Sequence, residues 1–284
     1  MFKILILGLG SAGQRHLRIL KKIFKKNKKK LKCFCIRETK RNLIINDNLK
    51  TKKIESLTKF YNLKEIEFKD LKNMNFDLAI VSNPIHKHIS TAIKIAKNKI
   101  NLIVEKPLSN NKNKINLLKK IVKKNRINIR VGYQLRYHPG IKIFKSIVDK
   151  NKLGYPISGL FYFGEYLPNM HKYEDYEKTH MSIFKQGGGA INCLSHQIDL
   201  INYLIGKPVK VISKFNKASK LRINVEDNLH AILFYKNSRK FTLNINFLKS
   251  PPRNFIFMEF QNGSVEWDYH KNYISVYNNK TKKI

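Results

Sequence analysis

Cysteine is scarce in this chain of 284 residues. Only Cys33, Cys35 and Cys193 are present. A small, odd number of cysteines predicts no disulfide framework, so we expect the reducing cytoplasm as the location. Cys33 and Cys35 alternate along an expected strand, and no second Cys/His pair stands at zinc-site spacing. Buried packing is the favoured interpretation of this pair, and no metal site is predicted.

Long apolar runs are also missing. No segment reaches the ~18 apolar residues that a membrane-spanning helix needs. The apolar stretch at the N-terminus is short, and Arg15, His16 and Arg18 follow it closely. A secretory leader needs an apolar stretch of ~7–15 residues and a cleavage site, so this interpretation is rejected.

Acidic residues are few: 19 Asp and Glu stand against 57 Lys and Arg, for a formal charge of +38. Such a charge suggests a nucleic acid or an anionic membrane as partner. However, only ten of the 57 are arginine, the better match to phosphate. The lysines lie along helical segments throughout, as in KKIFKKNKKK and LLKKIVKKN. Solvated helix faces are therefore favoured. We predict no specific nucleic acid and no membrane as partner, and keep a polyanion-binding protein as the third hypothesis.

The first half of the chain alternates strand and helix patterns. A chain of this length most often forms two domains. Near-continuous apolar strands between amphipathic helices predict a doubly wound parallel sheet covered on both faces. The expected strands are 2–8, 31–37, 65–68, 76–83, 101–107 and 127–133.

After about residue 135 the pattern changes. One more helix, 138–151, precedes a strand at 157–166, and another helix starts near Gly188 and Gly189. Successive strands follow at 209–215, 228–235, 241–248, 253–260, 264–270 and 273–278. The predicted class is α/β: a dinucleotide-binding domain over 1–133, then an α+β domain over 134–284 with a mostly antiparallel sheet.

The first expected strand runs into G-x-G-x-x-G, formed by Gly8, Gly10 and Gly13. In a βαβ unit these glycines allow the tight turn, the approach of the pyrophosphate and helix–strand packing. The helix N-terminus, with Ser11 and Ala12, receives the negative charge. A tight turn without a ligand is the alternative.

The second expected strand ends in Ile36-Arg37-Glu38. An acidic residue there suits the ribose hydroxyls of NAD, whereas an arginine suits the extra phosphate of NADP. The predicted cofactor is NAD(P). Arg37 is nearer the strand end and favours NADP, although two solvated loop charges are nearly as good an interpretation.

Two further strands end in residues suited to a ligand. Ser82, Asn83 and Pro84, with His88 beyond them, lie at the carboxyl edge, where open α/β sheets bind ligands. Pro84 can form part of the nicotinamide pocket wall, and for His86 the start of a helix is the preferred interpretation.

Glu105-Lys106-Pro107 ends the next expected strand at the same edge. A lysine in this position can orient a substrate hydroxyl and stabilise charge on its oxygen. For a single lysine in so lysine-rich a chain, a solvated side chain would normally be the better interpretation.

The second domain contains GGGAINCLSHQIDL, residues 187–200. On one helix, Asn192, His196 and Asp199 would share a face. His196 is the natural general base, because its ordinary pKa is ~6.5. Asp199 or Asn192 could orient its ring, and a structural pairing near an interface is the alternative.

Together these motifs resemble the glucose–fructose oxidoreductase/inositol dehydrogenase/MocA family. The resemblance rests on GLGSAGQRHLR, SNPIHKH, EKP, QLRYHP, GGGAINCLSHQIDL and VEDNLHAILFY, in that order. The loop EYLPNMHKYEDYEKTH, 165–180, resembles members found with surface-polysaccharide and sugar biosynthesis.

The family implies a Rossmann domain, an open C-terminal sheet that forms a homo-oligomer, and NAD(P)-dependent chemistry at a carbinol carbon of a sugar, nucleotide sugar or cyclitol. Lys106 and His196 would be catalytic, and the nicotinamide would stack near Pro84 and Glu105. The substrate would meet Lys106, Arg136, Tyr137, Tyr166, Asn192 and His196.

Two departures from the family pattern support a second hypothesis, a non-catalytic dinucleotide-binding protein. Many members carry an aspartate where this chain has Asn192, and an asparagine cannot take a proton. Members usually continue into a helical tail, whereas this sequence stops after 278–284. Substrate identity, the direction of reaction and oligomer size are left open.

Overall fold

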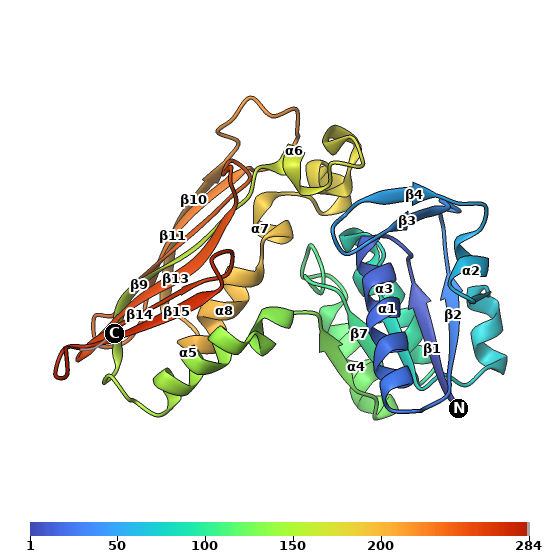
Figure 1. Cartoon of the computed structure of the whole chain (residues 1–284), viewed down its shortest axis with the longest axis horizontal. Helices are drawn as coiled ribbons and strands as arrows, with labels where there is room; N and C mark the ends of the chain where they lie inside the picture. The colour runs from blue at the N-terminus through green and yellow to red at the C-terminus, as the bar shows by residue number, and fades with distance from the viewer. Residues whose placement is uncertain (283–284) are drawn as a thin grey trace. The chain divides into compact units, whose positions relative to one another are not determined.

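The computed structural model describes residues 1–282 and divides the chain into two compact units (Figure 1). Unit 1 comprises residues 1–132 and 185–187, and unit 2 comprises residues 133–184 and 188–284. The last two residues of the predicted C-terminal domain, Lys283 and Ile284, lie outside the described residues.

Unit 1 is built on a six-stranded sheet in the order β5-β2-β1-β6-β7-β8, with parallel pairing throughout. This is the doubly wound arrangement that the alternating pattern predicts. Its strands are β1 (Phe2–Leu7), β2 (Leu31–Ile36), β5 (Lys64–Glu65), β6 (Leu78–Val81), β7 (Leu102–Val104) and β8 (Ile129–Val131).

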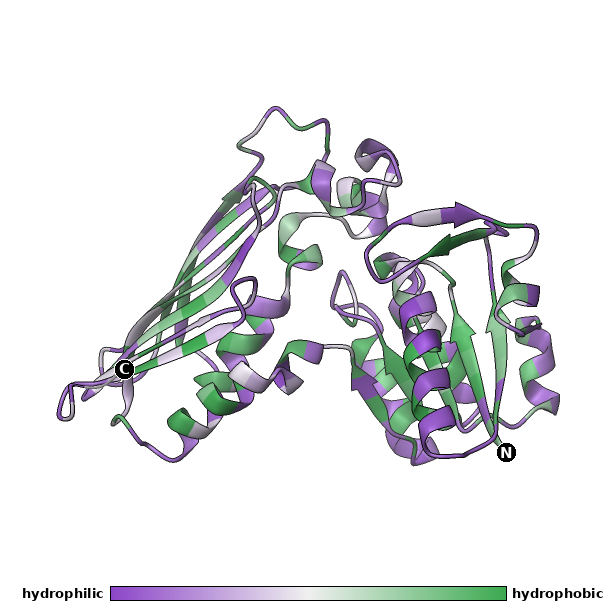
Figure 2. Ribbon diagram, viewed as in Figure 1, coloured by the Kyte–Doolittle hydropathy of each residue, from purple (hydrophilic) through white to green (hydrophobic). Residues whose placement is uncertain are grey.

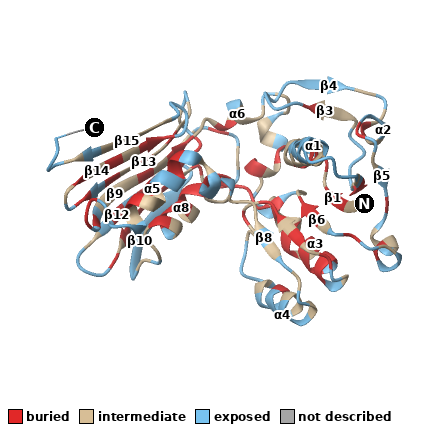
Figure 3. Ribbon diagram, turned by 60° about the horizontal axis from the view of Figure 1, so that its bottom comes forward, coloured by how far each residue is buried: buried red, intermediate tan, exposed pale blue. Residues whose placement is uncertain are grey.

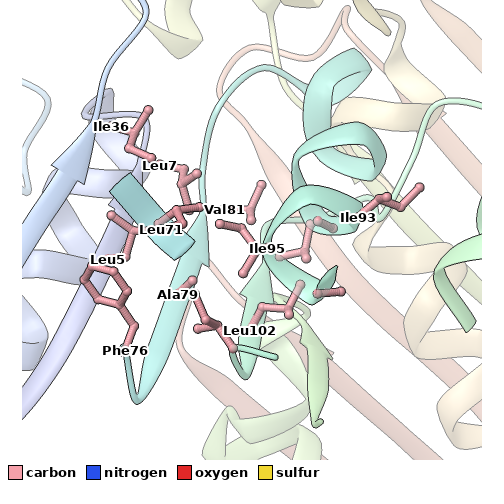
Figure 4. Packing of buried hydrophobic residues seen from close by; sticks show 14 of the residues in the cluster. Leu5, Leu7, Ile36, Leu71, Phe76, Ala79, Val81, Ile93, Ile95 and Leu102 are labelled. Atoms are coloured by element: carbon pink, nitrogen blue, oxygen red, sulfur yellow. The ribbon is translucent and has the colours of Figure 1, made fainter. Parts of the chain in front are cut away.

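The helices of unit 1 cover a parallel sheet whose strands are apolar on both faces. They are α1 (Ser11–Lys26), α2 (Leu57–Phe60), α3 (Ile85–Lys97) and α4 (Ile115–Asn125), with a 3₁₀ turn, η1 (Phe68–Asn73). On one face, Leu5, Val81 and Leu102 belong to one buried cluster with Ile95 of α3 (Figure 4). On the other, Ile4 and Ile80 pack with Leu17 of α1, in the cluster that also holds Cys33 and Cys35. The two cysteines are buried and free, as the packing interpretation predicts.

A short hairpin that the sequence pattern did not predict stands between β2 and α2. It consists of β3 (Leu43–Ile45) and β4 (Thr51–Lys53). The Gln14 amide, fully buried in α1, donates to the Leu43 carbonyl at 2.9 Å and accepts from the Ile45 backbone N–H at 2.9 Å. One glutamine therefore fixes the hairpin to the first helix.

Unit 2 is built on a seven-stranded sheet in the order β10-β11-β12-β9-β13-β14-β15. Only the pairing of β12 with β9 is parallel, so the expected mostly antiparallel sheet is confirmed. The strands are β9 (Pro156–Gly164), β10 (Lys210–Asn216), β11 (Asn228–Phe234), β12 (Lys240–Asn246), β13 (Arg253–Phe260), β14 (Gly263–Asp268) and β15 (Tyr273–Asn278).

One face of this sheet is covered by helices and the other is open. The three helices that contact the sheet are α5 (Pro139–Asp149), α7 (Ala190–Cys193) and α8 (His196–Leu204). Buried and exposed residues alternate along β11 and β12, whereas all of β10 is exposed (Figure 3). The remaining elements are α6 (Leu167–Met170) and the 3₁₀ turns η2 (Gln134–Tyr137), η3 (Tyr176–Lys178), η4 (His180–Ser182) and η5 (Phe184–Gln186).

The hydropathy of each residue follows this architecture (Figure 2). The central strands of unit 1 are hydrophobic, and α1 turns a largely hydrophilic side outward. Among residues 1–282, no helix combines the length and apolarity needed to cross a membrane.

Candidate functional site

In unit 1 the three glycines form a close turn between β1 and α1. Gly8 has a φ of +94°, and a Cβ there would lie 2.8 Å from the Ser82 carbonyl oxygen. A Cβ on Gly13 would lie only 2.0 Å from the Gly8 carbonyl oxygen. The Ser82 hydroxyl donates to that same oxygen at 2.9 Å. Gly8 and Gly13 are therefore needed for packing, and Ser82 ties the turn to the end of β6.

Gly10 has a different role, because a Cβ there would meet no heavy atom of residues 1–282 within 4 Å. It precedes α1, whose first turn, 11–14, carries no carboxylate. The first N–H groups of a helix lack partners within it and attract anions. Open space in front of a 16-residue helix, with Ser11 and Ala12 at its start, fits a dinucleotide pyrophosphate.

Residues at the end of β6 supply a polar acceptor and an exposed ring. Asn83 donates through Nδ2 to Thr91 Oγ1 at 2.8 Å. Its Oδ1 is buried and has no hydrogen-bond partner among the described residues. Pro84 is exposed at the start of α3. This edge therefore holds an acceptor without a protein partner among the described residues and exposes an apolar ring.

His88 is almost fully buried, and both its ring nitrogens face backbone carbonyls. Nδ1 lies 2.7 Å from the Pro107 oxygen, and Nε2 lies 2.8 Å from the Asn83 oxygen. Burial lowers the pKa of His88, although both carbonyl contacts favour its protonated form. The ring thus joins the ends of β6 and β7.

Glu105 is a buried carboxylate directly after β7. It accepts from His16 Nε2 at 2.7 Å, and the guanidinium of Arg15 lies 3.7 Å from the same oxygen. Burial alone would raise its pKa, but the hydrogen bond from His16 and the charges of His16, Arg15 and Lys106 lower it to about 2. Glu105 is therefore ionised at neutral pH.

Arg37 lies beyond β2, and its charge is already paired. Its Nη2 donates to Glu65 Oε2 at 2.8 Å, and only 7% of its side chain is exposed. The neighbouring Glu38 pairs with Lys87. Both residues therefore have protein partners at the edge where a ribose or its phosphate would bind.

In unit 2 the segment 190–204 is not one helix. α7 ends at Cys193, and α8 starts at His196 with Ser195 as its N-cap residue. The backbone leaves helical angles at Leu194, where φ is −103° and ψ is 27°. The predicted single helix carrying Asn192, His196 and Asp199 on one face is therefore wrong.

The side chains around His196 take roles that the sequence did not indicate. Asp199 binds Arg136 through two hydrogen bonds, and Asn192 donates to the Gly188 carbonyl at 3.3 Å. The buried ring of His196 meets Tyr133 edge to face, with centroids 5.9 Å apart. Burial raises the pKa of the Tyr133 phenol.

Glu226 binds the segment that leads to His196, a role that the sequence pattern did not indicate. Its Oε1 accepts from the Ile191 N–H at 3.0 Å, and its backbone carbonyl accepts from Ala190 N–H at 3.1 Å. Gly189, at a φ of +106°, leaves room for it, since a Cβ there would lie 2.2 Å from Oε1. Glu226 thus holds the start of α7, from which the chain continues to His196.

The remaining predicted substrate residues lie in unit 2. Tyr137 is 73% exposed, and Tyr166 is the half-buried residue before α6. Within the described part of the chain, no cluster of three or more His, Cys, Asp or Glu side chains could hold a metal ion.

Two family models match the chain. Residues 2–133 match an oxidoreductase family with an NAD-binding Rossmann fold, and residues 141–266 match the GFO/IDH/MocA C-terminal domain. The fold and the two matches define an NAD(P)-dependent dehydrogenase. The chain belongs to the Gfo/Idh/MocA oxidoreductase family, as the motifs indicated.

Solved structures with the same fold include two dehydrogenases and a protein of gentamicin A biosynthesis. WlbA dehydrogenase from Bordetella pertussis, solved with NADH and UDP-GlcNAcA, is 17% identical with a TM-score of 0.79 over 94% of this chain and 73% of that one. Levoglucosan dehydrogenase, solved with NADH and levoglucosan, is 15% identical, with a TM-score of 0.80 over 98% of this chain and 76% of that one. GenD2 from gentamicin A biosynthesis, solved with NAD, is 16% identical, with a TM-score of 0.76 over 94% of this chain and 72% of that one. A search of curated proteins found no match.

Proposed function

We propose that this oxidoreductase uses NAD(H) to transfer a hydride to or from a carbinol carbon of a sugar, nucleotide sugar or cyclitol. The observation that carries the proposal is the open helix start at Gly10, at the sheet edge that also bears Glu105 and Lys106. Support for the substrate class comes from the similar structures, whose ligands are UDP-GlcNAcA and levoglucosan.

The residue roles follow from chemistry and from the family. The nicotinamide supplies or accepts the hydride. Gly8, Gly10, Ser11, Ala12 and Gly13 would hold the pyrophosphate, and Ser82, Asn83, Pro84 and Glu105 the nicotinamide end. Lys106 would hold the substrate oxygen, and His196 would take or return the hydroxyl proton. Arg136, Tyr137, Tyr166 and Asn192 would contact the substrate.

The test is NADH absorbance across a panel of sugars, nucleotide sugars and inositols. Turnover with one class is expected, and Lys106→Ala and His196→Ala should each reduce kcat by about a hundredfold or more. Turnover that survives both substitutions would refute these roles.

The preference between NAD and NADP forms a separate part of the proposal. Arg37 favours NADP by position, but its guanidinium would have to share or leave Glu65 to bind a phosphate. A ligand that binds only the folded state raises apparent stability. A thermal-shift comparison should show the larger shift with NADPH if Arg37 takes this role, and Arg37→Ala should abolish the difference. Equal or larger shifts with NADH would rule it out.

We also propose a homo-oligomer formed through the open face of the unit 2 sheet. A largely apolar row crosses this face: Ile212 pairs with Ile232, and Leu160 pairs with Phe257, with Thr242 between the two pairs. Ile212 and Ile232 are 52% and 43% exposed. Ile232→Lys should lower the mass measured by light scattering, whereas Lys236→Ala in the nearby turn should not. An unchanged mass for Ile232→Lys would argue against this interface.

A non-catalytic dinucleotide-binding protein is the second candidate. It is motivated by Asn192, whose side-chain amide donates a hydrogen bond to the Gly188 carbonyl. This candidate predicts NADH binding without turnover, and restored turnover in Asn192→Asp.

The third candidate, a polyanion-binding protein, predicts nucleic-acid binding that survives physiological salt. Loss of binding above ~0.2 M salt would mark diffuse electrostatics. A cytoplasmic location stays a prediction.

A further inference from the structure

The residues on either side of Lys106 are each held by a histidine from a different helix. Glu105 is bound by His16 of α1, and Pro107 is bound by His88 of α3. The Lys106 turn is thus attached to the helix that follows the glycine turn and to the helix that follows Asn83 and Pro84.

On one side the attachment is a charge-assisted hydrogen bond. His16 Nε2 lies 2.7 Å from Glu105 Oε1, while the other carboxylate oxygen accepts from the Lys106 backbone N–H at 3.2 Å. A Cβ on Gly132, beyond β8, would lie 3.3 Å from Glu105 Oε2, so the carboxylate fills the space beside this glycine. The carboxylate is therefore fixed at both oxygens, and one of them fixes the Lys106 backbone.

On the other side the attachment is a buried imidazole. His88 is 2% exposed and lies between the carbonyl oxygens of Asn83 and Pro107. A neutral imidazole donates through one of its two nitrogens, so leucine in its place would leave one of these carbonyl oxygens without its donor, which typically costs stability and allows the turn to shift. Direct contact with the cofactor is not needed to explain why a histidine stands here.

We propose that His16 and His88 are positioning residues for Lys106: through Glu105 and Pro107 they fix the turn from which the lysine side chain projects. The proposal rests on the proposed function, in which Lys106 holds the substrate oxygen. A displacement of about 1 Å at a catalytic group can cost a hundredfold in rate. The two histidines would therefore affect the chemical step more than cofactor binding.

The first test compares variants that remove or keep each donor. His16→Leu and His88→Leu should lower kcat at least about tenfold. His16→Gln keeps a donor at the Nε2 position, and His88→Asn keeps one at the Nδ1 position, so both should retain kcat within about threefold of wild type. NADH affinity, measured by fluorescence, should fall by a smaller factor than kcat in both leucine variants. Lys22→Leu on α1 and His86→Leu on α3 are the matched controls.

The second test needs no substrate. Loss of the His16 donor leaves Arg15, at 3.7 Å, as the cation beside Glu105 Oε1, so the carboxylate should attract the Lys106 ammonium more strongly and protect the amine. Limited acetylation followed by mass spectrometry should show slower labelling of Lys106 in His16→Leu, wild-type labelling in His16→Gln, and no change at Lys22 in either. Unchanged labelling together with unchanged kcat would overturn the positioning role. If Lys106→Ala is fully active, the proposed role of Lys106 as holder of the substrate oxygen fails, while the labelling rates still decide whether the two histidines position this residue.

Discussion

Arg136 and Asp199 form a bidentate ion pair: Arg136 Nε donates to Asp199 Oδ2 at 2.8 Å, and Arg136 Nη2 donates to Asp199 Oδ1 at 2.5 Å. Asp199 is 8% exposed, and the guanidinium also lies over the Tyr203 ring, 4.9 Å from its centroid. Asp199 stands one turn after His196 in α8. The pair therefore ties the histidine-bearing helix to the η2 turn that carries Arg136.

The first prediction concerns this pair. Arg136→Ala leaves a nearly covered carboxylate without its main donors, and should lower the free energy of unfolding by about 2 kcal/mol. Asp199→Ala should cost a similar amount, and the double variant clearly less than the sum of the two. Urea unfolding of the four proteins measures this. Additive effects would show that the two side chains do not depend on each other.

The second prediction separates the glycines by role. Gly13→Ala should destabilise the fold by about 3 kcal/mol, because its methyl would meet the Gly8 carbonyl. Gly10→Ala meets nothing in the protein, so stability should change by less than about 0.5 kcal/mol. Its methyl would enter the space of the pyrophosphate and should weaken NADH binding by at least about tenfold, or 1.4 kcal/mol. Tight binding to Gly10→Ala would contradict the cofactor site.

The third prediction is a dependence of stability on acid. The pKa of Glu105 falls from its ordinary value of 4.5 to about 2 in the folded protein. The unfolded chain therefore binds the proton first, so this stabilisation is complete above pH 4.5 and is lost as the pH falls toward 2. The loss attributable to Glu105 is on the order of 3 kcal/mol. Glu105→Gln should flatten this part of the pH profile; an unaltered profile would contradict the assignment.

The fourth prediction concerns the cap on α7. Gly189→Ala should cost about 2 kcal/mol, because the residue would need a positive φ and would meet Glu226. Burial raises the pKa of Glu226, so its charge opposes folding as the pH rises through its ordinary 4.5 and beyond. Glu226→Gln keeps the acceptor without the charge and should be at least as stable as wild type at pH 7. Glu226→Leu loses the cap and should be about 1 kcal/mol less stable. Thermal unfolding distinguishes the two, and equal losses would show that the cap is irrelevant.

Much of the fold could be predicted because its signals are local. The periodic strands β13 (Arg253–Phe260) and β15 (Tyr273–Asn278) have the predicted bounds. The hairpin of β3 and β4 was missed because its strands have three residues each, and β4 is fully exposed. Ser109 is of a type that often precedes a helix, but α4 starts only at Ile115. Residues before Ile115 form hydrogen bonds with one another; for example, the Asn111 N–H donates to Ser109 Oγ.

The candidate site was predicted where a motif fixes residue type, and missed where partners are distant in sequence. His16 and Glu105 are 89 residues apart, and Ile191 and Glu226 are 35 apart. Nothing in the local pattern around Glu226 indicates which backbone N–H it accepts from. Asp199 was considered as a partner for His196, but only the three-dimensional arrangement brings Arg136 to it.

Strand β9 lies in the middle of the unit 2 sheet, although it is the first strand of that unit to be synthesised. The two strands that pair with it start at Lys240 and Arg253. Neither edge of β9 can therefore form its hydrogen bonds until the last part of the chain has been synthesised. During synthesis, Phe161 and Phe163 would therefore stay unburied until those strands emerge. A nascent chain stopped before residue 240 should be cleaved readily by protease within 156–164, and resistance there would show that β9 is protected earlier by other means.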